Sequence, residues 1–329
     1  MSFHIVRIDS PQCSLSCKDG RLVRKAPGEP DKSLPLEDVA SIIITSFSAQ
    51  IHSHLFLEAA KHGVALIICE DFKPVSLVLP ANRSTDTLLS RALLKLDGAK
   101  RERMWQATVD AKCRNQHALA EHLAPGDAAL PGLRACAYGK KPHKEGICAK
   151  AFWGVFGRAM GEGEFSRERA SGGLNSLLNY GYAVLLSTVL QKLFGVGLDP
   201  TFGVSHVPRE RSTPLAYDLM EPFRPCVDAR VAAWVAAERG KGEGGERKNG
   251  GANGANLPPS HFRPPTFLVT PEFRKWVTAF PLDRVEYLGL ELNVQSCIEG
   301  VVRGFRRAVL TGDLKHYRPW ITSPTHLFQ

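Results

Sequence analysis

The spacing of apolar residues changes from strand-like to helix-like near residue 85, and this change limits the fold more than any other feature. Upstream, residues 39–45 and 64–70 are β-branched apolar runs with the length of buried strands. Asp19-Gly20 separates two shorter runs, which predicts a tight hairpin because both turn residues need a positive φ. A short helix is expected between the two apolar runs, over residues 51–62.

Downstream, apolar residues recur every three or four positions, as on one face of an α-helix. We expect helical stretches over residues 86–123, 145–160, 172–194, 215–238, 271–280 and 284–310. Residues 239–257 are rich in Gly, Lys, Glu and Asn, a composition that buries too little apolar surface to become ordered. The sequence therefore predicts an α+β protein, with a small β-rich N-terminal domain (1–85), a larger all-helical domain (86–329) and a flexible loop at 239–257.

Charge and composition narrow the class of protein. The 329 residues carry a formal net charge of +9, which favours a polyanionic partner because a Lys or Arg placed on a phosphate releases counterions. Charge alone leaves nucleic acid and no specific partner equally open. The sequence has no run of eighteen apolar residues, and His4, Arg7 and Asp9 give its first segment a strand pattern and not that of a signal peptide. We expect a cytoplasmic protein that does not enter a membrane.

Eight cysteines are scattered along the chain without the paired spacing of a zinc knuckle. Cys13 and Cys17 come closest, but no second pair completes a site. We expect buried free thiols.

Glu145 is the first candidate for chemistry. Apolar residues follow it at Cys148 and Phe152, so Glu145 heads the helical face that the core uses. Taken alone, an acid at this position more often interacts with the positive end of the helix than with a ligand.

His206 is the second candidate. It lies in a loop flanked by Gly203 and Pro208, after an apolar helix that ends near Gly195. Such a loop leaves the imidazole free to point where it is needed, although most histidines of this kind are ordinary surface residues.

Asp218, Glu221 and Arg224 form the third candidate group. Their three-residue spacing places acid and base on one side of a helical turn. The same pattern resembles a capping box, with Pro222 tolerated in the first turn. On these residues alone, capping and catalysis stay equally open.

The three groups together favour a metal site. Two carboxylates and one imidazole, from three separate segments, suit Mg²⁺ or Mn²⁺ with water at the remaining positions. A hard divalent cation beside basic residues is what phosphodiester chemistry requires, because it polarises the phosphate and stabilises the attacking or leaving oxygen.

Four segments of the chain resemble the universal CRISPR-associated integrase family, called here the Cas-one family. They are EGICAKAFW at 145–153, LNSLLNYGYAVL at 174–185, GLDP at 197–200 leading to His206, and PLAYDLMEPFRP at 214–225. The long wording around 179–182 and 219–225 resembles type II systems, although Tyr217 stands where those versions usually have a second acid. The resemblance extends over nearly the whole chain and is weakest in the first eighty residues.

The resemblance implies that Glu145, His206 and Glu221 are the catalytic metal ligands, with Asp218 close by and Arg224 facing DNA phosphates. It implies an endonuclease and integrase that joins the 3′-hydroxyls of a short DNA fragment, the spacer, to the CRISPR repeat by transesterification. The implied partners are double-stranded DNA, a second copy of the chain in a homodimer, and a small companion of the Cas-two family. We assign dimerisation to the β-rich domain.

Other functions stay open at this point. One is a DNA-binding assembly subunit whose own site is idle, against which the competent residues at all three ligand positions argue. Another is a relative used by a mobile element, which the chemistry of the sequence does not separate from spacer acquisition. Asn179 either hydrogen-bonds the metal shell or satisfies a buried neighbour, and we favour the structural role. The basic candidates for DNA contact, any of which can instead be solvated surface, are Lys140, Lys141, Lys144, Arg158, Arg167, Arg209, Arg211 and Arg224.

Overall fold

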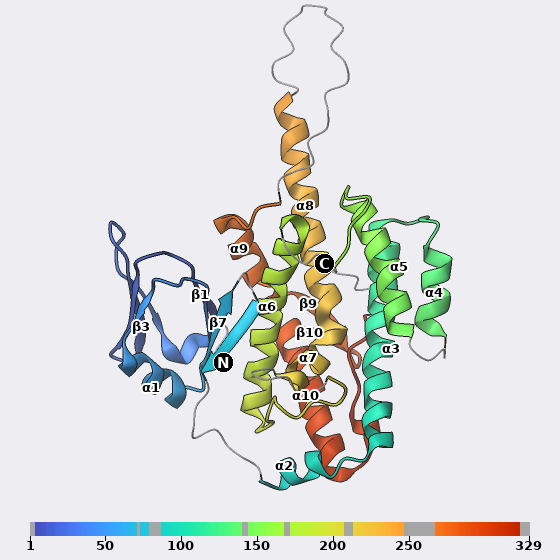
Figure 1. The fold of residues 1–329 in the computed structure, drawn as a ribbon, viewed down its shortest axis with the longest axis horizontal. Helices are drawn as coiled ribbons and strands as arrows, with labels where there is room; N and C mark the ends of the chain where they lie inside the picture. Colours follow the sequence, from blue (N-terminus) through green and yellow to red (C-terminus); the bar gives the residue numbers. More distant parts are fainter. Residues whose placement is uncertain are drawn as a thin grey trace, which may run out of the picture.

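A β-rich part lies on one side of a larger helical body in this protein (Figure 1). The computed structural model describes residues 4–70, 73–78, 87–139, 144–167, 172–206, 213–246 and 267–322. Strands come first along the chain and helices follow, which confirms the predicted α+β fold. The predicted boundary at residue 85 lies outside the described residues, between a strand that ends at Val78 and a helix that begins at Thr87.

Two four-stranded sheets form the N-terminal part. One has the order β1-β5-β7-β8, with β1, β5 and β7 parallel and β8 antiparallel to β7, and the other has the order β4-β3-β2-β6. Asp19 and Gly20 join β2 to β3 with φ values of 50° and 70°, as the tight turn requires. The elements are β1 (His4–Ile8), β2 (Ser14–Lys18), β3 (Arg21–Lys25), β4 (Lys32–Pro35), η1 (Leu36–Asp38), β5 (Val39–Ile44), β6 (Gln50–Ile51), α1 (Ser53–Lys61), β7 (Ala65–Glu70) and β8 (Lys73–Val78).

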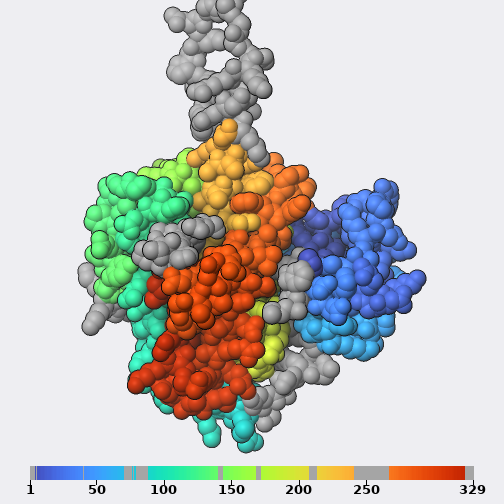
Figure 2. Space-filling view, turned by 180° about the vertical axis from the view of Figure 1, so that it is seen from behind, coloured from blue at the N-terminus to red at the C-terminus, as the bar shows by residue number. Residues whose placement is uncertain are grey.

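The first sheet connects two hydrophobic cores. Successive side chains of a strand point to opposite faces, so Ile42 and Ile44 pack inside the β-rich part while Ile43 and Ile67 pack against the helices. Figure 1 shows α6 facing these strands, and Figure 2 shows from behind that the N-terminal part forms a lobe beside the C-terminal helices. The helical body is therefore built directly onto one face of the sheet.

The helical part contains most of the predicted helices with small shifts at their ends. The predicted stretch 86–123 is divided at Asp97, whose side chain accepts a 2.7 Å hydrogen bond from the backbone N–H of Lys100 and so begins a new helix. The helices are α2 (Thr87–Leu94), α3 (Gly98–Leu123), α4 (Leu130–Tyr138), α5 (Lys144–Ala159), α6 (Gly173–Gly195), α7 (Pro214–Met220), η2 (Glu221–Phe223), α8 (Arg224–Glu246), α9 (Pro271–Thr278), η3 (Phe280–Leu282), α10 (Val294–Thr311) and η4 (Leu314–His316).

Two predictions for this part are wrong. A hairpin of β9 (Arg284–Tyr287) and β10 (Leu290–Asn293) replaces the start of the helix predicted from residue 284, so the part is not all-helical. Its turn, Leu288-Gly289, has positive φ values of 53° and 78°.

The second wrong prediction is the loop at 239–257, which is partly helical because α8 continues to residue 246. Arg239 anchors this end of α8 by donating hydrogen bonds to the carbonyl oxygens of Ala159 and Met160. Residues 247–257 lie outside the described residues.

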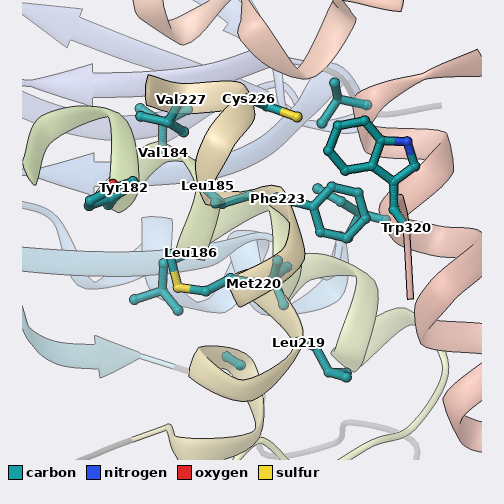
Figure 3. Packing of buried hydrophobic residues seen from close by; sticks show 14 of the residues in the cluster. Tyr182, Val184, Leu185, Leu186, Leu219, Met220, Phe223, Cys226, Val227 and Trp320 are labelled. Atoms are coloured by element: carbon teal, nitrogen blue, oxygen red, sulfur yellow. The ribbon is translucent and has the colours of Figure 1, made fainter. Parts of the chain in front are cut away.

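The core of the helical part surrounds α6 (Figure 3). Side chains on all sides of α6 are buried, and Leu185 and Val184 pack against residues of η2 and α8 such as Phe223. Phe223 stacks on Trp320, with ring centroids 5.5 Å apart and planes 6° apart.

All eight cysteines are free; six are buried, as predicted, whereas Cys17 and Cys136 are half-buried. Despite the apolar character of α6, the described helices include none that is both long and apolar enough to cross a membrane.

Candidate active site

The segment from α7 to α8 positions two buried carboxylates. Asp218 and Glu221 are 1% and 4% exposed, although acidic side chains are seldom buried without partners. Between the two helices, Glu221–Phe223 forms the short 3-10 turn η2. The turn directs the two acids to different neighbours: Asp218 contacts the loop that carries His206, and Glu221 contacts α3.

Glu221 and Glu145 converge on one ammonium group. Lys112 Nζ lies 2.6 Å from Glu221 Oε2 and 2.7 Å from Glu145 Oε1, and Arg224 Nε donates a 2.7 Å hydrogen bond to the other oxygen, Glu221 Oε1. Burial acts to raise the pKa of Glu221, but the charges of Arg224 and Lys112 outweigh burial and lower this pKa to about 2. Glu221 is therefore an anion at neutral pH, held between two cations.

Asp218 fixes the loop that carries His206. Its carboxylate accepts hydrogen bonds from the backbone N–H groups of Val204, Ser205 and His206, and it lies 2.7 Å from His206 Nδ1. The hydrogen bond with Asp218 raises the pKa of His206 despite partial burial of the ring. Because Nδ1 is bound to Asp218, Nε2 is the ring nitrogen that remains for a ligand, an arrangement typical of metal-binding histidines.

Gly203 lets this loop close on itself. A Cβ atom at Gly203 would lie 2.7 Å from the carbonyl oxygen of His206 and 2.7 Å from Cβ of Pro214. Neither the backbone atom nor the proline ring can yield by the required distance, so the loop geometry demands glycine here.

One face of α3 lines the whole site. The residues on this face of α3 are alternately four and three positions apart, so they form a single stripe along the helix. They are Arg101, Trp105, Thr108, Lys112 and Asn115. In this order they contact Gly203, His206, Tyr317, Glu221 and Pro222. Sequence reasoning missed this stripe; the available signal was four polar side chains on what should be the buried face of the helix.

Asn115 clamps the turn that carries Glu221. Its side-chain amide donates hydrogen bonds to the carbonyl oxygens of Pro222 and Trp320, at 2.8 and 3.0 Å, and its oxygen accepts one from the backbone N–H of Thr322. The side chain is fully buried. Asn115 thereby holds η2 against α3 and sets the position from which Glu221 reaches Lys112.

The other predicted site residues lie in the shell around the carboxylates. Arg167 donates a 2.8 Å hydrogen bond to Asn179 Oδ1, a contact that agrees with the structural role favoured for Asn179. Arg224 lies over the Tyr182 ring at 4.6 Å as well as against Glu221. Tyr217, which stands in place of an acid, has its ring 6.2 Å from that of His206.

All four predicted DNA contacts within the described residues have intramolecular partners, and those of Arg167 and Arg224 are given above. Lys144 is 4% exposed, and its ammonium group donates hydrogen bonds to the carbonyl oxygens of Ala137 and Gly139 at the end of α4, so it does not reach solvent as a DNA contact would. Arg158 pairs with Asp127 at 2.8 Å. The candidates that lie outside the described residues are Lys140, Lys141, Arg209 and Arg211.

The three proposed ligands are not gathered at metal-binding distances. Within the described part of the chain, no group of three or more His, Cys, Asp or Glu side chains is arranged to hold a metal ion. Glu145 and Glu221 meet at Lys112, whereas His206 faces Asp218. The donor chemistry nevertheless fits a hard cation, because two carboxylates already share one positive charge and the histidine has Nδ1 fixed by an acid. The metal assignment stays a prediction.

Asp228 is a buried acid behind this site. It is fully buried and accepts a hydrogen bond from the Tyr182 hydroxyl group. Burial raises the pKa of Asp228 to about 7, although that hydrogen bond and the charges of Arg167, Arg224 and Lys112 oppose the shift. The folded protein therefore keeps a proton that the unfolded chain releases above its ordinary value of 3.8.

We expect Asp228→Asn to be more stable than the wild type at pH 8 and similar to it near pH 4. The wild type should lose stability as the pH rises from about 4 to 7, because only the unfolded state ionises freely in this window. The variant has no such group and should lack this decline. Urea midpoints at the two pH values test the prediction, with the exposed Asp31→Asn as a surface control. Equal midpoints for wild type and Asp228→Asn at pH 8 would contradict it.

A cleft also lies elsewhere in the molecule. It has a volume of about 670 Å³ and lies between the β-rich part and α9, with Arg7, Tyr180 and Arg274 among its lining residues. Neither the carboxylates of the site nor His206 line it. We expect the chemistry at the carboxylates, because two acids from separate elements converge there on one buried ammonium group.

This chain is similar to proteins of a known family. The family described as CRISPR associated protein Cas1 has a sequence model that matches residues 6–137 and 142–253. A CRISPR-associated endonuclease Cas1 from Neisseria meningitidis serogroup C (strain 8013) is 30% identical over 219 residues, covering 66% of this chain and 71% of that protein.

Solved structures share the fold. A casposase bound to integration product superposes with a TM-score of 0.68 at 21% identity, covering 95% of this chain and 92% of that chain. A Cas6-RT-Cas1–Cas2 complex also gives 0.68, at 14% identity, covering 96% of this chain and 36% of that chain. At these identities the superpositions establish the architecture, and the family model, which matches well over half of the residues, establishes descent. The chain belongs to the CRISPR associated protein Cas1 family.

Proposed function

We propose that this chain is a divalent-metal-dependent DNA endonuclease and integrase that inserts short DNA fragments into a CRISPR array. The observation that carries the proposal is the convergence of Glu145 and Glu221 on a single positive charge, at 2.7 and 2.6 Å. Two further facts support it: a relative in Neisseria meningitidis is named an endonuclease, and the net charge of +9 suits a DNA partner.

Glu145, Glu221 and His206 would hold Mg²⁺ or Mn²⁺. When bound, the metal would polarise the phosphate under attack and stabilise the departing oxygen. The protein's own residues contribute position: Asp218 orients His206 through Nδ1, and Arg224 holds one oxygen of Glu221. Asn115 keeps the turn of Glu221 against α3.

The proposed reaction exchanges one phosphodiester bond for another. The 3′-hydroxyl oxygen of the fragment attacks a phosphorus atom of the repeat and loses its proton. A new P–O bond forms as the P–O bond to the repeat's own 3′ oxygen breaks, and that oxygen takes up a proton. The number of phosphodiester bonds is unchanged, so the reaction needs accurate placement and charge stabilisation and no external source of energy.

The partners in this proposal are double-stranded DNA, a second copy of the chain and a small Cas2-type companion. The support for the companion is the shared fold with a chain of a Cas6-RT-Cas1–Cas2 complex. We assign the homodimer contact to the β-rich part, which forms a lobe at the side of the helical body (Figure 2).

Strand joining tests the proposal directly. The purified protein, with and without the companion, would receive a short duplex with free 3′ ends and a supercoiled plasmid carrying a repeat. We expect joined product with Mn²⁺ or Mg²⁺ and none with chelator. Glu145→Gln should lower the rate by about 10²–10³-fold, the usual cost of removing one group that stabilises transition-state charge. Glu299→Gln is the matched control, because Glu299 also pairs with a lysine, Lys192 at 3.3 Å, but lies on α10.

Tight DNA binding without a metal-dependent product would favour an idle assembly subunit instead. Metal-dependent product that survives Glu145→Gln would leave the activity in place and remove Glu145 from the site.

A further inference from the structure

A lysine side chain occupies the position between the two carboxylates. Lys112 reaches them from α3, Glu145 belongs to α5 and Glu221 to η2, so three separate elements meet at this ammonium group. The lysine side chain is 11% exposed, and that of Glu221 is 5% exposed. The 2.7 Å contact with Glu145 is a charge-assisted hydrogen bond, and the contact with Glu221 is an ion pair at 2.6 Å.

Both oxygens of Glu221 are occupied by cations. Arg224 Nε donates a hydrogen bond to Oε1, and Lys112 Nζ forms an ion pair with Oε2. A divalent cation that binds Glu221 must therefore displace one of these two groups or accept a second positive charge at the same oxygen. Arg224 is the less movable of the two, because its guanidinium group also lies 4.6 Å over the Tyr182 ring. Lys112 has a flexible four-carbon stem and no comparable second contact among the described residues except Glu145.

Removing the ammonium group would leave two carboxylates facing each other. Like charges at this separation repel, and burial makes the repulsion stronger because water screens it less. Lys112 thus keeps the pair of acids converged, which is the geometry that a metal needs.

We propose that Lys112 is a positioning residue that holds Glu145 and Glu221 together as a ready ligand pair and gives up its place when a divalent cation binds. The inference rests on the proposed function, since it assumes that these two acids are metal ligands. In the metal-free site, the ammonium group of Lys112 then occupies the position between the two carboxylates until a divalent cation replaces it. The lysine stabilises the metal-free protein and competes with the metal.

Metal affinity and metal-free stability test this role without measuring catalysis. Lys112→Met should bind Mn²⁺ about tenfold more tightly or better than the wild type, a change that corresponds to about 1.4 kcal/mol. The metal-free variant should melt at a lower temperature, and Mn²⁺ should raise its melting temperature more than that of the wild type. Calorimetric titration with Mn²⁺ alone, at pH 8 and without DNA, gives the affinity. Thermal unfolding with and without Mn²⁺ gives the melting temperature of the metal-free protein and its rise on metal binding.

Two control variants separate positioning from general damage. Lys112→Arg keeps the charge and should bind Mn²⁺ as the wild type does. Lys100→Met removes a lysine of the same helix, one that pairs with Asp97 at 3.6 Å, and should change neither readout. If Lys112→Met does not fold, Lys112→Gln, which keeps hydrogen-bond donors without the charge, carries the same expectation.

The outcomes distinguish this inference from the proposed function. Mn²⁺ affinity in a folded Lys112→Met or Lys112→Gln that equals or falls below the wild-type value would overturn the role of Lys112 and leave the metal site standing. Glu221→Ala is expected to bind no Mn²⁺. If the wild type also binds none, the metal site itself is overturned, and this inference with it.

Discussion

Glu221→Gln is expected to reduce metal-dependent DNA joining by about 10²–10³-fold, because it removes one negative charge from the centre of the site. The amide retains an oxygen that accepts a hydrogen bond, so Arg224 or Lys112 keeps a partner, but neither keeps a counter-charge. Gln also fills the same volume in a position that is 4% exposed. The loss should therefore appear mainly in joining and less in folding.

Glu221→Ala is the less informative variant for this purpose. It leaves two cations, Arg224 and Lys112, beside a vacated buried position, and breaking a buried pair in this way costs about 3–5 kcal/mol. Lost joining in the alanine variant would then mix lost chemistry with lost folding. Comparing both variants by joining rate and by urea unfolding separates the two effects.

Glu299→Gln is the matched control for Glu221→Gln. Glu299 on α10 also pairs with one lysine and one arginine, Lys192 at 3.3 Å and Arg303 at 2.8 Å, but it lies outside the site. It should join DNA at the wild-type rate. If Glu221→Gln retained more than about a tenth of wild-type joining, this glutamate would not be a metal ligand.

The fold was predictable where local pattern and tertiary packing agree. Residues 39–44 and 65–70 are strands because β-branched side chains fit a sheet that is covered on both faces. Asp19-Gly20 forms the expected turn because few other residue pairs adopt two positive φ values. The hairpin at 284–293 was missed because Val285, Leu288 and Leu292 also have helical spacing, and a real helix follows at once.

The site was predictable only in part. Glu145, His206 and Glu221 were named from their resemblance to a family, and local pattern alone left each of them ambiguous. Lys112 was missed, because a lysine within a charged helix usually indicates a solvated face. Its role depends on Glu145 and Glu221, which are 33 and 109 positions away in sequence and come together only in the fold.

Asn115 shows the same limit from another direction. Its partners are backbone carbonyl groups of Pro222 and Trp320, and a backbone carbonyl leaves no trace in the sequence. A buried asparagine in mid-helix does signal that some partner exists, since buried amides are almost always hydrogen-bonded. The sequence can therefore indicate that such an asparagine has a hydrogen-bond partner, but it does not identify that partner.

Asp218→Ala is expected to destabilise the protein by about 1.5–3 kcal/mol, because one buried carboxylate is the acceptor for several donors at once and hydrogen bonds to a charged group are worth about this much. It accepts hydrogen bonds from three consecutive backbone N–H groups, at residues 204–206, and it contacts His206 Nδ1. None of these donors has a second carboxylate within the described residues around the loop. Metal affinity should also fall by about 10–100-fold, the usual effect of losing the acid that orients a ligating histidine.

Two comparisons give this prediction its contrast. Asp218→Asn keeps the shape and one oxygen, but its NH₂ group faces donors, so we expect an intermediate loss of stability. Asp127→Ala removes an acid that also accepts from a backbone N–H, that of Ala129, and from Arg158, yet lies away from the site; it should leave Mn²⁺ affinity unchanged. Urea unfolding and Mn²⁺ titration on the same preparations decide the matter. An Asp218→Ala variant within about 1 kcal/mol of the wild type would mean that the loop holds His206 without the Asp218 carboxylate, since a lost hydrogen bond to a charged group costs more than that.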